Sequence, residues 1–144
     1  MSRLVRKRTI LIADDEPEVV QLVRMILEWE GYTVVAAADG LETLERVETH
    51  NPDLILLDVR MPKMSGLTVL EHLAKSEAVA IPVIMLSVVT TQPEVRAALQ
   101  RGAVAYLTKP FELKEMTRLV DQILAMDDAK RDAFRQTALG VLEI

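Results

Sequence analysis

Short apolar runs alternate with longer amphipathic stretches along this chain, and no other feature limits its possible folds as strongly. The apolar runs lie at 9–14, 33–38, 53–58, 82–87 and 103–107. Such runs are typical of strands buried on both faces, because a strand with one face in water shows polar residues at every second position. Strict alternation of these strands with helices predicts a parallel sheet that helices cover on both sides.

The helical stretches separate and follow the strands, at about 17–30, 40–50, 66–76, 93–102 and from near Leu113. Pro17 stands at the start of the first stretch and Gly31 just after it, which is the usual asymmetry of helix ends. Right-handed crossovers leave few strand orders, and five strands fit the order 2-1-3-4-5. We therefore expect an α/β fold with a doubly wound, five-stranded parallel sheet of the flavodoxin-like type.

Residues 127–144 extend beyond these five strand–helix units. Five apolar side chains would line one face of a further helix there: Ala133, Phe134, Ala138, Val141 and Leu142. Asp127 or Asp128 would cap its start. We expect one domain over residues 1–126 and a helical extension or linker over 127–144, with packing, linking and dimerisation all open as its role.

Composition excludes several classes of protein. The chain has 144 residues, enough for one domain with a substantial core, and no cysteine, which rules out disulfides and thiolate metal sites within it. Its net charge of −5 argues against nucleic acid as a direct ligand, and no apolar run is long enough to span a membrane. The basic stretch 1–8 lacks the apolar segment of a signal peptide, so we expect a cytoplasmic protein.

Polar residues stand where the predicted strands end. The first strand ends in Asp14 and Asp15, the third in Asp58 and the fourth in Ser87, and Lys109 comes just after the fifth. Ligands of open parallel sheets bind beyond the carboxyl ends of the strands, where the strand order reverses. We therefore expect three carboxylates, one hydroxyl and one ammonium to converge on a single crevice.

This set of groups suits phosphoryl chemistry. Close carboxylates raise one another's pKa unless a cation compensates them, and two cations fit: the ammonium of Lys109, and Mg²⁺, which prefers oxygen ligands. Asp58 is placed to attack phosphorus and form an acyl phosphate. Mg²⁺ and Lys109 would screen the charge on the transferred group, and Ser87 would hydrogen-bond one of its oxygens.

Four motifs carry a specific resemblance. They are ADDEP (13–17), LLDVRMPKMSG (56–66), MLS (85–87) and YLTKPF (106–111). In this order and spacing they resemble the receiver domain of two-component response regulators, of the chemotaxis-regulator type, over roughly residues 8–126. The resemblance implies that Asp58 is the phosphoacceptor. It also implies that Asp15, Asp58 and the backbone carbonyl of Arg60 bind Mg²⁺ directly, and that Asp14 acts mainly through water.

The resemblance extends to a conformational switch. It implies that Ser87 and Tyr106 form the switch pair and that Lys109 is the lysine that accompanies the phosphoacceptor. Gly66 matches the tight turn beyond the phosphorylation loop, and the Lys109–Pro110 bond is expected to be cis.

The partners implied by the resemblance are those of a signalling domain rather than an enzyme. A sensor histidine kinase or phosphotransfer protein would supply the phosphoryl group. The surface formed by the helix at 93–102, the strand at 103–107 and the helix from Leu113 would then change its preference for a downstream output domain or protein. A homodimer is left open.

Some positions depart from the family's common pattern. Val88 follows Ser87 where similar domains usually carry alanine or glycine, and its β-branched side chain would crowd the approach to a phosphoryl group. Arg60 and Val89 flank the site at positions that tune dephosphorylation in the family. We expect an altered phosphate lifetime, in a direction that the sequence leaves open. Tyr106 has an alternative role as a half-buried packing residue.

Other chemistries fit less well. Phosphatases of the haloacid-dehalogenase type carry a second aspartate two residues after the nucleophile, where this chain has Arg60. A flavodoxin-like cofactor site needs a hydroxyl- and glycine-rich loop after the first strand, and a dinucleotide site needs GxGxxG, which is absent. The remaining rival is a receiver-like protein-interaction module that is not phosphorylated.

Overall fold

The computed structural model describes residues 7–76, 80–88 and 91–142. Its sheet has five parallel strands in the order β2-β1-β3-β4-β5. The strands are β1 (Thr9–Ala13), β2 (Thr33–Ala37), β3 (Leu54–Asp58), β4 (Val83–Ser87) and β5 (Ala105–Thr108). The predicted doubly wound α/β fold and its strand order are therefore confirmed.

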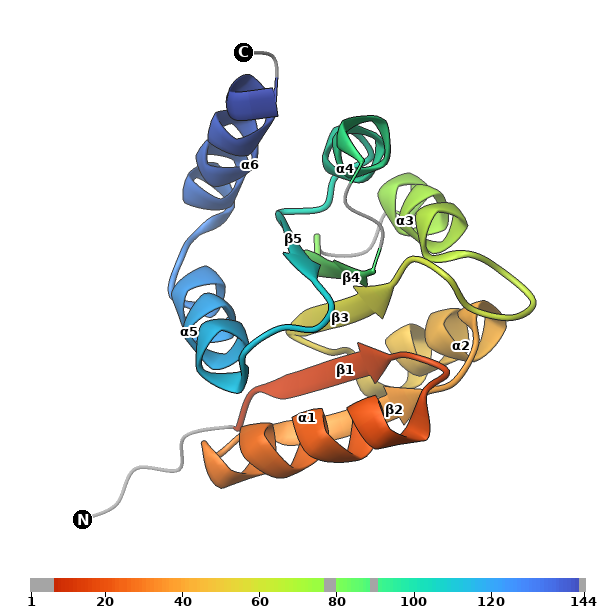
Figure 1. Ribbon diagram of the computed structural model, residues 1–144. Coiled ribbons are helices and arrows are strands. Elements are labelled where there is room, and N and C mark those ends of the chain that lie inside the picture. Colours follow the sequence, from red (N-terminus) through yellow and green to blue (C-terminus); the bar gives the residue numbers. More distant parts are fainter. Residues whose placement is uncertain (1–6, 77–79, 89–90, 143–144) are drawn as a thin grey trace.

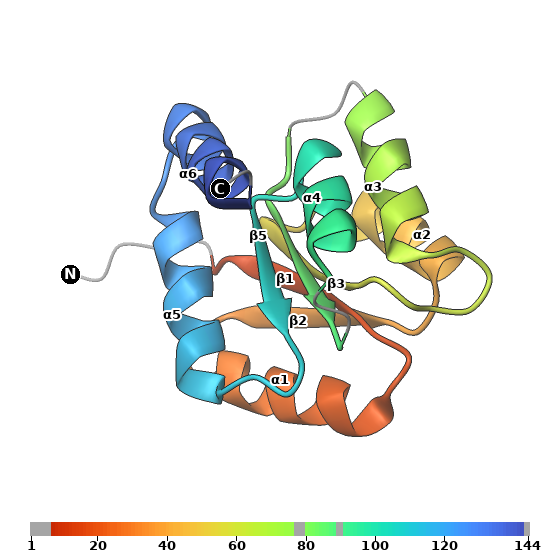
Figure 2. The same ribbon diagram turned by 45° about the horizontal axis from the view of Figure 1, so that its top comes forward.

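Helices cover both faces of the sheet. They are α1 (Pro17–Trp29), α2 (Gly40–His50), α3 (Gly66–Lys75), α4 (Gln92–Gln100), α5 (Leu113–Leu124) and α6 (Asp128–Leu142). Helices α1 and α5 lie on one face, while α2, α3 and α4 lie on the other (Figures 1 and 2). None of the helices within the described part of the chain is both long and apolar enough to cross a membrane.

Each face of the sheet has its own hydrophobic core. Ile10 and Ile12 of β1 pack into the core beneath α1 and α5, whereas Leu11 and Ala13 pack into the core on the opposite face. All four side chains are fully buried. A strand with two buried faces needs apolar residues at every position, which explains why the strand sequences are continuous apolar runs.

The register of the sheet sets the positions of the strand ends. Ala13 is level with Leu57, and Asp58 is level with Leu86. Ser87 is level with Thr108, so Lys109 follows directly beyond it, and its backbone N–H donates to the Ser87 carbonyl at 2.8 Å. The carboxyl ends of β1, β3, β4 and β5 therefore meet along one edge.

Helix α6 lies over the outer side of β5, and it contacts both α4 and β5 (Figures 1 and 2). Asp127 caps it by accepting a hydrogen bond from the Lys130 backbone N–H at 2.8 Å, as one of the two predicted options. Four of the five predicted face residues line the cavity beneath α6: Phe134, Ala138, Val141 and Leu142. Ala133 is instead exposed, because its side chain is rotated about a quarter turn around the helix from that of Phe134.

Candidate functional site

A buried lysine lies at the centre of the acidic crevice. The Lys109 Nζ is 2.6 Å from Asp14 Oδ2, 2.9 Å from Glu16 Oε1 and 3.1 Å from Asp58 Oδ2. Lys109 reaches this position from the loop after β5, and its bond to Pro110 is cis, as the resemblance implied. The predicted convergence of Asp14, Asp58 and Lys109 is thus present in the structure.

The charge of Lys109 is stabilised by its acidic partners. Burial alone would lower the pKa of the ammonium, but hydrogen bonds to Asp14, Glu16 and Asp58 outweigh burial and hold the pKa well above its ordinary value. Lys109 is therefore a permanent cation at neutral pH, and it compensates part of the negative charge in the crevice.

The Asp58 carboxylate is a less stable anion here than it is in water. Its side chain is buried, and burial is the main cause that raises its pKa. The Arg60 backbone N–H donates to Asp58 Oδ1 at 3.1 Å and lowers the pKa, the nearby Asp14 raises it, and Lys109 lowers it. The balance leaves Asp58 with a raised pKa, so bonding to an electrophile or a cation would relieve an unfavourable charge.

Gly66 fits tightly against the backbone at Asp58. It is the first residue of α3, and its N–H donates to the Val59 carbonyl at 2.8 Å. A Cβ added at Gly66 would overlap the carbonyl oxygen of Asp58. The glycine predicted at a tight turn is therefore required by the close approach of two backbone segments. Its φ is not in the left-handed region, which among the described glycines is occupied by Gly31 and Gly102.

The acidic side chains of the crevice form two groups. Carboxylate oxygens of Asp14, Glu16 and Asp58 lie within 4.8 Å of one another. Asp14 is buried and its Oδ1 accepts the Glu16 N–H at 2.9 Å, which draws Glu16 toward the site. Asp15 is exposed and lines the same crevice as Asp58, but it does not belong to this close group. Sequence reasoning missed Glu16, whose only signal is its place directly after the two aspartates.

The donor set of the crevice fits a hard divalent cation. Its atoms are carboxylate oxygens: those of Asp14, Glu16 and Asp58 lie close together around the Lys109 ammonium, and Asp15 adds a further carboxylate to the same crevice. Mg²⁺ favours such oxygen ligands and keeps several waters, so one or two carboxylates suffice to hold it.

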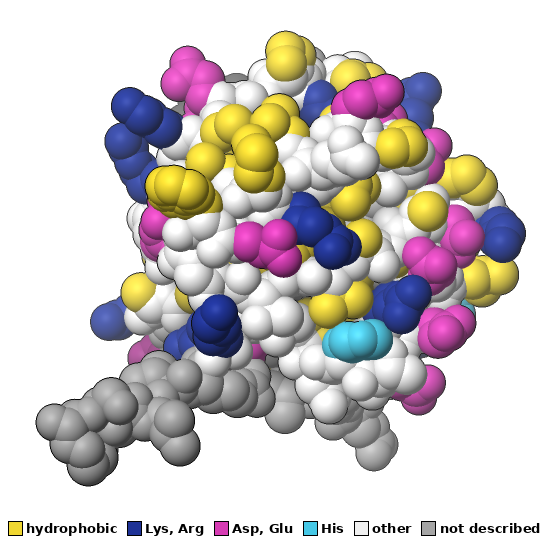
Figure 3. All heavy atoms as spheres, turned by 90° about the horizontal axis from the view of Figure 1, so that it is seen from below, with side chains coloured by type: hydrophobic (Ala, Val, Ile, Leu, Met, Phe, Trp, Pro, Cys, Tyr) yellow, Lys and Arg dark blue, Asp and Glu magenta, His cyan; other side chains and the backbone are white. Residues whose placement is uncertain are grey.

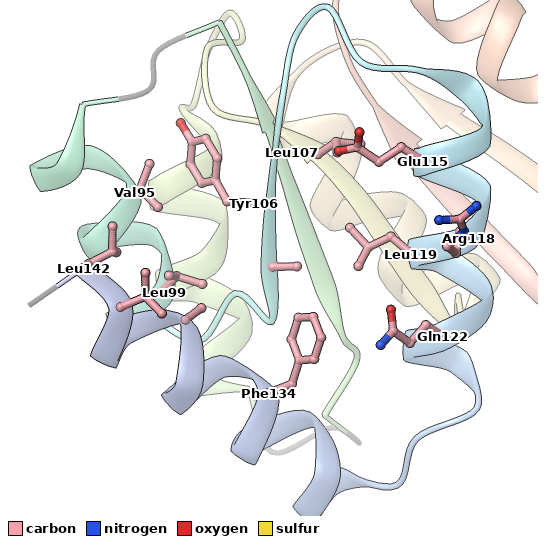
Figure 4. A pocket seen from close by; sticks show the side chains of 13 residues that line it. Val95, Leu99, Tyr106, Leu107, Glu115, Arg118, Leu119, Gln122, Phe134 and Leu142 are labelled. Atoms are coloured by element: carbon pink, nitrogen blue, oxygen red, sulfur yellow. The ribbon is translucent and has the colours of Figure 1, made fainter. Parts of the chain in front are cut away.

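The predicted switch pair is in contact. Ser87 is 1% exposed and lines the crevice beside Asp58. Tyr106, on the neighbouring β5, is half-buried; burial raises the pKa of its phenol, and a hydrogen bond with the Ser87 side chain partly offsets that rise. Tyr106 therefore lies between the acidic crevice and the cavity beneath α6, which it also lines (Figure 4).

The rim of the crevice holds the positions that depart from the family pattern. Val88 is 64% exposed and lines the crevice together with Arg60, which is also exposed. Val89 lies outside the described residues. The crevice has a volume of about 280 Å³, which is room for a phosphoryl-sized group and its waters.

A 2-1-3-4-5 parallel sheet with acids and a lysine at its strand ends defines a receiver-type signalling domain. Residues 10–121 match the response regulator receiver domain, and the chain belongs to this family. It is 39% identical over 117 residues to the alkaline phosphatase synthesis transcriptional regulatory protein PhoP of Bacillus subtilis, covering 81% of this chain and 48% of that protein. It is 40% identical over 120 residues to the DNA-binding dual master transcriptional regulator RpaA of Synechocystis, covering 83% and 50%.

Solved structures agree with this assignment. The receiver domain of the Francisella response regulator 1452 is similar with a TM-score of 0.77 and 32% identity, over 82% of this chain and 97% of that one. A CheY-like receiver domain protein from Methanospirillum hungatei is similar with a TM-score of 0.78 and 30% identity, over 83% and 94%. The chain spans about half the length of the curated relatives it matches, so the shared part is their receiver domain.

Proposed function

We propose that Asp58 accepts a phosphoryl group from the phosphohistidine of a sensor histidine kinase or phosphotransfer protein. An Asp58 carboxylate oxygen forms a bond to phosphorus while the bond between phosphorus and the donor's imidazole nitrogen breaks, and the imidazole leaves with its electron pair. The single observation that carries this proposal is the buried Asp58 carboxylate 3.1 Å from the Lys109 ammonium in a crevice open to solvent.

Two residues of the crevice would bind the transferred phosphoryl group. Lys109 is already beside Asp58, so its ammonium would meet a developing phosphoryl charge without rearrangement. Ser87 would donate its hydroxyl to another phosphoryl oxygen. The domain promotes only its own phosphorylation and dephosphorylation, and is a signalling domain rather than an enzyme that acts on other substrates.

Mg²⁺ is the proposed cofactor. Asp15, Asp58 and the Arg60 backbone carbonyl would hold it directly, with Asp14 acting through water, as the family resemblance implies. The bound ion supplies positive charge that offsets the phosphoryl oxygens. The oxygen-only donor set and the closeness of Asp14 and Asp58 support this assignment.

The donor protein has a suitable contact surface beside the crevice. A groove of about 360 Å³ runs between α1 and the loop after β5, lined by Leu22, Val88, Lys109 and Phe111 among others. Exposed apolar side chains continue along α1, and hydrophobic side chains gather on the side of the molecule where α1 lies (Figure 3). A phosphohistidine must approach Asp58 across this rim, so its protein would cover the groove.

The proposed signal would pass to an output partner through one surface of the receiver. We place the receiver in residues 1–126 and treat 127–144 as a helical extension that covers the α4–β5–α5 face. Phosphorylation would change the preference of this face for a downstream output domain or protein. The two relatives named above are transcriptional regulators, which supports an output domain or protein that binds DNA; the receiver itself would make no direct contact with nucleic acid.

The phosphoryl mimic beryllofluoride tests the proposal. Isothermal titration should show binding to the wild-type chain when Mg²⁺ is present and none when it is chelated, and Asp58→Asn should abolish binding. Acetyl phosphate with Mg²⁺ should label Asp58 in a peptide map. The alternative, a receiver-like interaction module that is not phosphorylated, predicts neither binding nor label, and that pair of results would overturn the proposal.

A further inference from the structure

Arginine side chains hold α6 in place by contacting the last carbonyl groups of helices. Such carbonyls have no partner within their own helix, and a nearby cation also interacts favourably with the helix dipole. Three hydrogen bonds of 3.0 Å make the contacts: Arg131 Nε to Ile123 O of α5, Arg135 Nη1 to Leu99 O of α4, and Arg96 Nη2 to Leu142 O of α6 itself. Polar contacts therefore carry much of the docking of α6.

The apolar part of the same contact is shallow. Over its described length, α6 has no fully buried residue. Phe134 is its main anchor and packs, half-buried, against the core under α1 and α5. A cavity of about 440 Å³ remains beneath α6, lined by Val95, Leu107 and Leu119 along with Phe134 (Figure 4). Helix α6 covers this face without filling it.

The covered face includes the open edge of the sheet. β5 is the last strand in the order, so within the described sheet no strand pairs with its outer backbone groups, and α6 lies along that side (Figure 1). An uncovered edge beside an apolar surface invites contact with another chain. A partner that binds this face of the domain must therefore displace α6 first.

Tyr106 connects α6 with the acidic crevice. Its ring lines the cavity together with Leu142 of α6, and its hydroxyl is hydrogen-bonded to the Ser87 side chain. In the proposed reaction, the Ser87 hydroxyl donates a hydrogen bond to a phosphoryl oxygen on Asp58. Tyr106 then loses or changes this contact, and its ring changes the wall against which α6 packs.

We propose that α6 is a detachable cover of the α4–β5–α5 face and that phosphorylation of Asp58 weakens its docking through Tyr106. The coupling rests on the proposed phosphorylation, whereas the detachment does not. An isolated helix of this length is marginal in water, so α6 amides lose their protection whenever the helix leaves the face. Detachment is therefore visible to hydrogen exchange.

Hydrogen exchange of the full chain tests the detachment. Amides of α6 should exchange faster than those of β1, β3 and β4, because α6 opens while the rest of the domain stays folded. Adding beryllofluoride and Mg²⁺ should speed α6 exchange at least about fivefold, the low end of ordinary allosteric coupling, and Asp58→Asn should remove this acceleration. α6 exchange as slow as that of the central strands would overturn the detachment.

A pair of variants tests the coupling in the reverse direction. Phe134→Ala removes the apolar anchor and Arg135→Gln removes one arginine contact, so each should bind beryllofluoride about fivefold more tightly, because linkage between two sites is reciprocal. Gln136→Ala, at an exposed position of the same helix, is the matched control and should leave the affinity unchanged.

The two proposals fail in different ways. Measured beryllofluoride binding with unchanged α6 exchange and unchanged variant affinities would overturn the coupling alone. Absence of any Mg²⁺-dependent binding would overturn the proposed phosphorylation and the coupling with it, while the exchange rates without ligand would still decide the detachment.

Discussion

The Nζ of Lys109 lies 2.6 Å from the Oδ2 of Asp14, and their side chains are only 9% and 0% exposed. In an ion pair buried to this degree, each charge has lost its hydration and is stabilised mainly by its partner. The same ammonium also reaches Glu16 and Asp58. Lys109 is thus the built-in cation around which the acidic crevice can fold.

Replacing Lys109 by methionine should destabilise the fold. The substitution leaves Asp14 and Asp58 buried without their cation, and removing one partner of a buried pair typically costs about 3–5 kcal/mol. Urea unfolding measures the loss. Mg²⁺ should stabilise Lys109→Met more than the wild type, because it would compensate the same carboxylates. A variant as stable as the wild type would show that the acids do not depend on Lys109.

Neutralising Asp58 should stabilise the domain at neutral pH. The raised pKa means that the folded state binds the Asp58 proton more tightly than the unfolded chain does. Its contribution to stability is therefore least favourable above the raised pKa and improves as the pH falls toward 3.8. Asp58→Asn should therefore gain stability at pH 7.5, and the gain should shrink as the pH falls through this window.

Asp39 provides a control, because its pKa is shifted in the opposite direction to that of Asp58. Its pKa is lowered, first by the hydrogen bond from the Glu42 backbone N–H at the start of α2. That stabilisation is present above the ordinary pKa of 3.8 and is lost as the pH falls through the lowered value. Asp39→Ala should therefore lower stability at pH 7.5, in contrast to Asp58→Asn. Equal pH dependence in both variants would contradict the assigned environments.

Gly66→Ala should disturb the end of β3. The added Cβ overlaps the Asp58 carbonyl, and overpacking of this kind costs about 1–3 kcal/mol or more when backbone must move. Labelling by acetyl phosphate should fall as well. Gly140→Ala is the matched control, since its Cβ meets no atom of the described residues within 4 Å outside its own helix backbone and should strengthen α6 by up to about 1 kcal/mol. Equal stability of the two variants would refute the steric argument.

Val88→Ala should shorten the life of the acyl phosphate. Val88 stands at the rim of the crevice, 64% exposed, so it shields the phosphoryl position without filling it. A smaller side chain admits water, and we expect hydrolysis to become several-fold faster. Release of inorganic phosphate from the labelled protein measures the rate. Identical rates of acyl-phosphate hydrolysis in the two proteins would show that Val88 has no role in the phosphate lifetime.

Leu22→Asp should slow phosphoryl transfer from a protein donor without affecting transfer from a small-molecule donor. Leu22 is 46% exposed and lines the groove beside Lys109, where a charge would disrupt an apolar contact. Transfer from a phosphorylated histidine kinase that labels the wild type should slow by about tenfold or more. Labelling by acetyl phosphate, which needs no docking, should be unchanged. Equal loss with both donors would mean that the substitution damages the crevice itself.

The strands and most of the site were predictable because their signals are local. Asp58 ends a run of buried apolar residues, and the parallel strand order alone brings it to the same edge as Ser87 and Lys109. The strand order followed from handedness and connection rules. Element ends were less certain: β5 begins at Ala105, two residues after the predicted start, because Gly102 turns the chain with a φ of 111° and Ala103 still bonds back to α4.

The roles of neighbouring acids were harder to predict. Nothing in the ADDEP stretch distinguishes Asp15 from Glu16, yet Glu16 reaches Lys109 while Asp15 faces solvent. That choice depends on the Asp14 side chain, which binds the Glu16 N–H and turns the chain at the start of α1. Likewise, the docking of α6 depends on arginines that contact distant carbonyls, and these contacts cannot be predicted from a hydrophobic pattern.

Trp29 is the only tryptophan of the chain and is 86% exposed at the end of α1. Its indole emission should therefore be red-shifted and easily quenched by iodide while that end of the helix faces water. A protein that covers this end would shift the emission to the blue and protect it from quenching. The domain thus carries an intrinsic optical reporter of contacts on α1, with no dye attached.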